Sequence, residues 1–124
     1  MIRIARATRR LESMTRFYRD GLGFPIVDHF TGHAGYSGVI LAMHDRVELE
    51  LTSHARGRTG ARPDPDDLLV IHLATAAEVE RIHRRLESLG HSSVTPLNPW
   101  WLVRAVTFED PDGWRVVLCD DSAS

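Results

Sequence analysis

The sequence contains seven histidines and one cysteine, whose side chains can bind metals or take part in catalysis near neutral pH. An imidazole can ligate a metal or shuttle a proton in this pH range. His72 is of greatest interest, because it lies in an apolar run that is typical of a strand, LLVIHL at 68–73. A lone histidine on a strand is more often a structural residue, so a ligand-binding role and a structural role both stay open.

Four other histidines fall in the first half of the chain, at positions 29, 33, 44 and 54. His29 and His33 have the i, i+4 spacing of a ligand pair on a helix, but the Thr-Gly pair between them argues against a helix. A metal site that combines Glu50, His72 and a loop histidine is a further alternative. No pair of these residues has a recognisable ligand spacing.

Cys119 could act as a nucleophile only with a base beside it, and no motif indicates such a base. The sequence favours a small apolar strand residue at this position. A single cysteine excludes an intrachain disulfide and predicts a reducing, cytoplasmic environment.

Two adjacent tryptophans, Trp100 and Trp101, follow the stiff, proline-containing segment PLNP at 96–99. Aromatic side chains offer a large apolar area and can stack on flat ligands. The alternative is that one of them fills the core or a subunit interface. We expect one of the two to contact a ligand.

The composition describes an ordinary globular chain of 124 residues, with 43% hydrophobic residues and a net charge of −2. This charge offers no argument for binding nucleic acid or an anionic membrane. All 15 basic residues are arginines, which indicates coding bias in a GC-rich bacterial genome rather than a function. We expect no signal peptide and no membrane span, because no apolar run is long enough.

The elements that position these residues occur twice. The segment 106–118 predicts two strands joined by a turn at Pro111 and Gly113, with apolar residues alternating on both sides. Its residues Val106, Phe108, Asp112, Val116 and Leu118 each lie 67 positions after a counterpart, namely Val39, Leu41, Asp45, Leu49 and Leu51. A fixed offset of half the chain, with a helix preceding each hairpin, indicates two similar units in tandem.

Each half therefore predicts a strand, a helix and three further strands. In the first half we expect strands at 2–7, 24–27, 39–43 and 46–52, a helix at 11–22 and a turn or loop at 32–38. In the second half we expect strands at 68–73, at 91–94 and on both sides of the 110–113 turn. We also expect a helix that begins at a Thr75–Glu78 capping box and ends at Gly90. Its buried side chains should be those of Val79, Ile82, Leu86 and Leu89. The predicted organisation is one domain, 1–124, with units at 1–52 and 68–120, a linker at 53–67 and a tail at 121–124.

Three segments carry a resemblance to a known superfamily: FYRDGLGF at 17–24, ELELT at 48–52 and FEDPDGW at 108–114. The chain resembles the vicinal oxygen chelate superfamily of glyoxalases, bleomycin-resistance proteins and extradiol dioxygenases. The resemblance covers nearly the whole chain and implies an α+β fold, in which two tandem βαβββ units form a curved mixed sheet around a cleft. The segments NPWW at 98–101 and RIAR at 3–6 are similar to one bacterial subgroup of that superfamily.

In metal-dependent members, the resemblance places the ligands at Arg3, Glu50, Leu68 and Val117 of this chain. Only Glu50 is a plausible donor, because arginine keeps its positive charge and the two aliphatic side chains have no lone pairs. We therefore expect no cofactor, with a divalent metal as the alternative. Arg3 and Glu50 should pair on adjacent inner strands, either to orient a polar ligand or as a structural ion pair.

Strand parity adds further residues to the same inner faces: Glu48, Thr52, Val70, His72, Arg115 and Cys119. The residues that alternate with them are more uniformly apolar and suit packing under helices. The predicted ligand-binding set is Arg3, Glu50, His72, Trp100, Trp101 and Arg115.

Three functions follow from this resemblance. The preferred one is a metal-independent protein, commonly a homodimer, that binds a small molecule such as an antibiotic or an aromatic metabolite. The second is a metal-dependent enzyme of the glyoxalase or dioxygenase type. The third is a metal-free enzyme with Glu50 as general base and Arg3 as the partner of an oxyanion.

Overall fold

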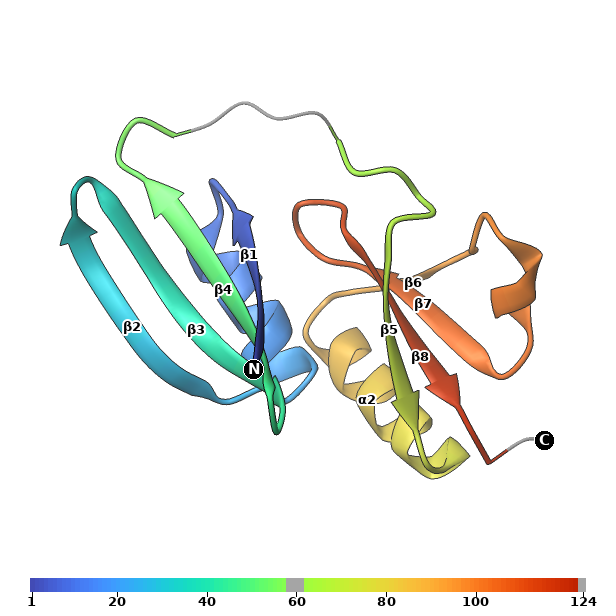
Figure 1. The fold of residues 1–124 in the computed structure, drawn as a ribbon. Coiled ribbons are helices and arrows are strands. Elements are labelled where there is room, and N and C mark those ends of the chain that lie inside the picture. Colours follow the sequence, from blue (N-terminus) through green and yellow to red (C-terminus); the bar gives the residue numbers. More distant parts are fainter. Residues whose placement is uncertain (58–61, 123–124) are drawn as a thin grey trace. The chain divides into compact units, whose positions relative to one another are not determined.

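The computed structural model describes residues 1–57 and 62–122, and the chain divides into two compact units, Met1–Ala61 and Arg62–Ser124. We call them unit 1 and unit 2. Each unit contains a strand, a helix and three further strands in that order, and each folds into one four-stranded sheet (Figure 1). The tandem βαβββ architecture expected from the sequence is therefore confirmed.

Unit 1 consists of β1 (Ile2–Ala7), α1 (Leu11–Arg16), a π-helical turn (Phe17–Gly21), β2 (Ile26–His33), β3 (Tyr36–His44) and β4 (Val47–His54). The strand order in its sheet is β1-β4-β3-β2. The β1–β4 pair is parallel and the other two pairs are antiparallel. The helical segment follows β1 and precedes β2 in the chain. In the sheet these two strands lie at opposite edges, and β1 pairs with β4, the last strand of the unit.

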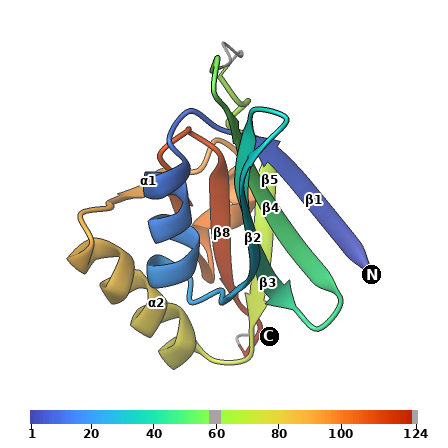
Figure 2. The same cartoon turned by 90° about the vertical axis from the view of Figure 1, so that its left-hand side faces the viewer.

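The core of unit 1 forms where α1 covers one face of this sheet (Figure 2). Leu41, Leu49 and Leu51 point to that face and are fully or almost fully buried, as are Phe17 and Tyr18 from the helical segment. Burial of such large apolar side chains is the main stabilising contribution to a small unit. The helix expected at 11–22 is present, but its second half is π-helical: the amide of residue 22 donates to the carbonyl of Phe17 at 3.0 Å.

Unit 2 consists of β5 (Leu68–Leu73), α2 (Ala76–Ser88), β6 (Ser93–Val94), a 3-10 helix (Pro99–Leu102), β7 (Ala105–Glu109) and β8 (Arg115–Asp120). The strand order is β5-β8-β7-β6, with β5 and β8 parallel. It repeats the topology of unit 1, and α2 contacts β5, β7 and β8.

The N-cap role of Thr75 is confirmed, because the amide of Glu78 donates to the Thr75 hydroxyl at 3.2 Å. The Glu78 side chain reaches back as predicted, but it accepts from the Thr75 hydroxyl, at 3.4 Å. Val79, Ile82 and Leu86 are buried as predicted. The prediction for Leu89 was wrong: its side chain is 37% exposed. Leu89 is the C-cap residue and its backbone is no longer helical. Its side chain therefore does not continue the buried stripe of the helix.

The β7–β8 hairpin turns around Asp110, which is 4% exposed. Its Oδ1 accepts hydrogen bonds from the amides of Asp112 and Trp114, each at 2.9 Å. The amide of Gly113, where φ is +92°, donates to the Asp110 carbonyl. Pro111 and Gly113 were predicted to shape this turn, whereas the role of the aspartate side chain was not.

Two predicted boundaries in the first half were wrong. The second strand is β2, eight residues long, instead of the short strand at 24–27. The loop expected at 32–38 is a two-residue turn, Ala34-Gly35, and both residues have positive φ (53° and 85°). Two consecutive left-handed residues are typical of the tight hairpin turn that matches the twist of its strands.

The other differences are at element ends. The strand expected at 91–94 is confined to 93–94, and the loop at 96–101 contains a 3-10 helix. Residues 53 and 54 of the expected linker belong to β4, while 58–61 of the linker and 123–124 of the tail lie outside the described residues. Within the described ranges, the helices are too short and too polar to cross a membrane.

Candidate functional site

The sheet register of unit 1 places Arg3, Glu48 and Glu50 on one face. Arg3 lies beside Glu48 in the parallel β1–β4 pair, and Ala5 lies beside Glu50. Because side chains alternate along a strand, Leu49 points to the opposite, buried face. We call the face defined by Arg3, Glu48, Glu50 and Thr52 the polar face, and its composition agrees with the predicted parity.

The guanidinium of Arg3 contacts both carboxylates of the polar face. Its Nε and Nη2 donate to Oε1 of Glu48 at 3.1 and 2.9 Å, while Nη1 lies 3.7 Å from Oε1 of Glu50. The expected pairing of Arg3 with Glu50 is therefore present, but Glu48 is the principal partner. The parallel register explains this preference, because Glu48 is directly opposite Arg3 and Glu50 is two residues farther along β4.

Small and apolar side chains border the carboxylates. Ala5 and Ile40 flank Glu50 on the neighbouring strands, and Ala42 lies beside Glu48. The Glu48 and Glu50 side chains are 24% and 20% exposed, and Arg3 is 41% exposed. Ile40 is buried, so the apolar area beside the carboxylates comes from Ala5 and Ala42. The polar face therefore offers hydrogen-bond acceptors, one cation and a small apolar area, an arrangement suited to an organic ligand with both polar and apolar parts.

Arg115 was predicted to bind a ligand, and the structure places it in contacts within unit 2. Its Nε donates to Oε1 of Glu109 at 3.1 Å, and its Nη1 donates to the carbonyl of Thr95 at 3.1 Å. The side chain is 13% exposed. These bonds connect β8 to β7 and to the segment after β6, so the observed contacts of Arg115 are structural.

The two tryptophans lie on the 3-10 helix, whose N-cap is Asn98: its Oδ1 accepts from the amide of Trp100 at 3.0 Å. Trp100 is 76% exposed, and Trp101 is half-buried. Leu102 and Val103 next to them are also exposed. Contact of one tryptophan with a ligand stays a prediction.

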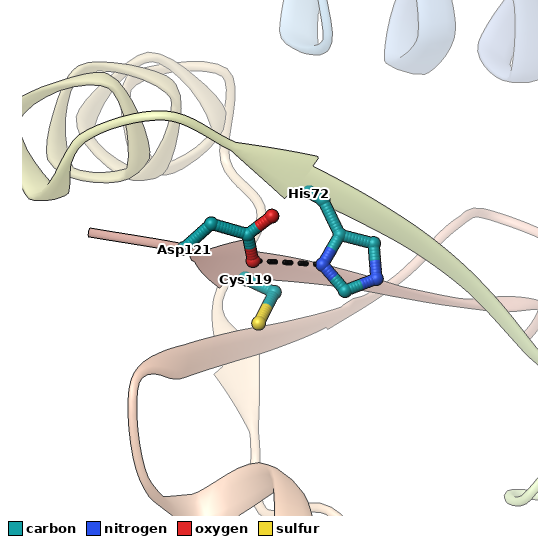
Figure 3. Close-up of side chains that lie close together, drawn as sticks. All are labelled: His72, Cys119 and Asp121. Atoms are coloured by element: carbon teal, nitrogen blue, oxygen red, sulfur yellow. Dashed lines mark hydrogen bonds and ion pairs between the residues drawn. The ribbon is translucent and has the colours of Figure 1, made fainter. Parts of the chain in front are cut away.

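A second polar group forms in unit 2, at the C-terminal ends of β5 and β8. His72 and Cys119 are direct neighbours in the parallel pairing. Asp121 follows β8, and its Oδ1 is 2.8 Å from Nδ1 of His72 (Figure 3). The potential ligand atoms of the three residues all lie within 4.8 Å of one another. Parity predicted that His72 and Cys119 lie on inner strand faces, but it did not predict that they are neighbours. It also missed Asp121, which was assigned to the polar tail.

Burial raises the pKa of the Cys119 thiol, and the negative charge of Asp121 raises this pKa further. The thiol therefore keeps its proton at neutral pH when no metal ion is bound to it. This agrees with the interpretation that Cys119 is not an activated nucleophile.

The remaining histidines do not form a comparable group. Among residues 1–57 and 62–122, His72, Cys119 and Asp121 are the one set of three or more such donors found to converge. His54 packs edge-on against Tyr36 at 4.6 Å between ring centroids, while His29 and His33 lie on β2, a strand, as the absence of a helix predicted. The site combining Glu50, His72 and a loop histidine draws on both units and stays a prediction.

Comparison with known proteins identifies the family. Models of the YycE-like N-terminal and C-terminal domains match residues 2–52 and 66–120. The chain is 42% identical to the protein YycE of Bacillus subtilis over 118 residues. This alignment covers 94% of this chain and 85% of YycE. The chain belongs to the YycE-like family. The crystal structure of B. subtilis YycE, a protein of unknown function, matches the YycE-like chain with a TM-score of 0.93 at 39% identity over 100% of this chain and 91% of YycE.

More distant structures share the fold of the YycE-like chain and have different activities. Glyoxalase I of Leishmania major matches with a TM-score of 0.76 at 16% identity, covering 98% of this chain and 86% of its own. TnmS3, an antibiotic-binding protein of a Streptomyces species, matches with a TM-score of 0.67 at 22% identity, covering 95% and 92%. These matches confirm the vicinal oxygen chelate fold, but at such identities they leave the activity of the YycE-like chain open.

The four superfamily metal positions of the YycE-like chain do not fit a metal ion. The guanidinium of Arg3 contacts both carboxylates of the polar face, and its fixed positive charge disfavours a cation beside them. The unit 2 positions are Leu68 and Val117, whose hydrocarbon side chains have no donor atoms. Glu50 as general base and Arg3 as oxyanion partner stay predictions.

Proposed function

We propose that this YycE-like chain binds a small organic molecule on the polar face of unit 1, without a metal at the four superfamily positions. The observation that carries the proposal is the contact of Arg3 with both Glu48 and Glu50. Arg3 hydrogen-bonds to Glu48 and lies within ion-pair distance of Glu50. Its positive charge holds the two half-buried carboxylates on one face, which favours a preorganised ligand site and disfavours a metal ion beside the guanidinium.

The chemistry of the polar face indicates the class of ligand. Carboxylates that face solvent accept hydrogen bonds from amines, amides and hydroxyls, and the exposed part of Arg3 can donate to an acceptor on the same molecule. The apolar surface of Ala5, which is exposed, and of Ala42, which is partly exposed, suits an apolar or planar body. We therefore propose an antibiotic or aromatic metabolite that carries amine or hydroxyl groups, which is consistent with antibiotic binding by TnmS3.

The proposal includes a cytoplasmic location and a homodimer. One free cysteine is consistent with a reducing compartment. Exposed apolar side chains at Trp100, Leu102 and Val103 are consistent with a surface that a second copy or a ligand covers. Light scattering of the purified chain measures its oligomeric state directly.

Arg3→Met is expected to weaken ligand binding at least about tenfold, since a hydrogen bond to a charged group is worth about 1.5–3 kcal/mol. Bleomycin, fosfomycin and a panel of aromatic amines would be titrated in EDTA, with isothermal titration calorimetry and thermal stabilisation as readouts. Arg46→Met, at an exposed position in the β3–β4 turn, is the matched control and should bind as the unaltered chain does.

Arg3→Met should change the free energy of unfolding by less than about 1 kcal/mol, because ion pairs of exposed arginines contribute little. Lost binding would therefore not reflect lost folding. The proposal would be overturned if no compound of the panel stabilised the chain, if EDTA abolished all binding, or if Arg3→Met bound as tightly as Arg46→Met.

A further inference from the structure

The group His72, Cys119 and Asp121 lies outside the superfamily metal positions. His72 is four residues beyond Leu68 on β5, and Cys119 is two residues beyond Val117 on β8. Both therefore point to the same face of the unit 2 sheet as those positions, farther toward the strand ends. All donors of this group belong to unit 2, so its geometry depends on one compact unit alone.

The backbone around Asp121 is held by hydrogen bonds, although this residue follows the last strand. Its amide donates to the carbonyl of Leu73 at 2.9 Å, which extends the β5–β8 ladder by one step. The preceding amide, of Asp120, donates to the carbonyl of Arg104 at 2.7 Å. These two hydrogen bonds hold the backbone of Asp121 beside the end of β5, which places its carboxylate next to His72.

The donor set is typical of a borderline transition metal. Thiolate, imidazole and carboxylate together suit zinc and its neighbours, whereas magnesium and calcium prefer oxygen donors alone. Bond lengths of about 2.0–2.3 Å separate tetrahedral ligands by about 3.3–3.8 Å. Donor atoms within 4.8 Å of one another can reach this spacing by small side-chain rotations.

The charges near Cys119 favour a cation. Two carboxylates, of Asp120 and Asp121, and one guanidinium, of Arg104, act on the thiol, and together they carry a net charge of −1. A bound cation compensates this charge and the charge of the thiolate that coordinates it. The hydrogen bond between His72 and Asp121 would be replaced by bonds from both side chains to the ion.

We propose that His72, Cys119 and Asp121 bind a zinc-type transition-metal ion at the C-terminal ends of β5 and β8, with one coordination position left for water or an exogenous ligand. This site goes beyond the proposed function, which involves only the polar face of unit 1. The metal connects the end of β5 to the end of β8.

The test uses the full chain, reduced and freed of metal, titrated with Zn²⁺ and with Co²⁺ as a spectroscopic probe. We expect one metal ion per chain and a thiolate-to-cobalt charge-transfer absorption. Cys119→Ser should abolish this absorption and weaken zinc binding at least about 100-fold, more than the roughly 10–100-fold expected for loss of a supporting residue. His72→Gln should weaken zinc binding to a similar degree.

His44→Gln is the matched control, because His44 is exposed at the end of β3 and outside the group. It should bind zinc as the unaltered chain does, and circular dichroism verifies that every variant is folded. A cobalt complex without the charge-transfer band, or equal zinc binding by Cys119→Ser and the unaltered chain, would overturn the proposal. Ligand binding to the polar face should persist in Cys119→Ser, which separates this site from the proposed function.

Discussion

Asp110→Ala is expected to lower the free energy of unfolding by about 2–4 kcal/mol, because two backbone amides lose their acceptor at once. Asp112 and Trp114 both donate to the Asp110 side chain at 2.9 Å, inside a turn where Asp110 itself is 4% exposed. Water cannot fully replace a buried acceptor, so the amides remain poorly satisfied. For a chain of this size the melting temperature should fall by roughly 10 °C, as measured by thermal unfolding monitored by circular dichroism.

The internal repeat provides the control for this prediction. Asp45 lies in the corresponding turn of unit 1 and is exposed, so Asp45→Ala should change the free energy of unfolding by no more than about 0.5 kcal/mol. Asp110→Asn keeps a side-chain oxygen as acceptor and should restore part of the loss. If Asp110→Ala proved as stable as Asp45→Ala, the turn would not depend on this side chain.

Gly38→Ala is expected to destabilise unit 1 by about 2–3 kcal/mol, the usual cost of overpacking a tight interior. A methyl group on Gly38 would lie 2.6 Å from Cζ of Phe30 and 2.7 Å from the carbonyl oxygen of Leu51. The Phe30 ring can rotate away, but the Leu51 carbonyl belongs to the central strand β4 and cannot move without disturbing the sheet. Urea unfolding of the purified variant measures the loss.

A second variant separates these two clashes. In a Phe30→Ala background, Gly38→Ala should cost less than in the unaltered chain, because only the contact with the carbonyl of Leu51 remains. Gly32→Ala is a further comparison: a methyl group there meets no atom within 4 Å, and only the positive φ of +67° is unfavourable. A Gly38→Ala variant no less stable than Gly32→Ala would contradict the predicted clash.

The duplicated topology was predictable from the sequence because it depends on local patterns. Alternating apolar residues repeat at an offset of 67 positions, and Thr75 with Glu78 marks the start of α2. Parity also assigned Glu48 and Glu50 to one face and Leu49 to the other, since a strand alternates regardless of what packs on it.

The extent of β2 was not predictable by the same reasoning. This strand lies at the edge of the sheet, and most of its residues are exposed. An edge strand with little buried surface needs no alternation of apolar and polar residues, so Asp28 and His29 were not recognised as part of a strand. The Ala34-Gly35 turn was missed because alanine seldom adopts the positive φ that it has here.

Sequence patterns predicted which candidate residues share a strand face, but they did not predict which of these residues contact each other. Whether Arg3 contacts Glu48 or Glu50 depends on the register between β1 and β4, which are 45 residues apart in the sequence. Asp121 reaches His72 only through the parallel β5–β8 ladder. Parallel register is set by tertiary packing, and local patterns do not encode it.

We expect no metal to bind at Arg3, Glu50, Leu68 and Val117, and we expect the polar face to bind its ligand without one. The most direct test is the metal content of Cys119→Ser after exposure to nickel, zinc, iron and manganese, measured by mass spectrometry. This variant removes the separate site proposed in unit 2. We predict no stoichiometric metal, whereas one metal ion per chain that disappears in the Cys119→Ser, Glu50→Gln double variant would contradict the account.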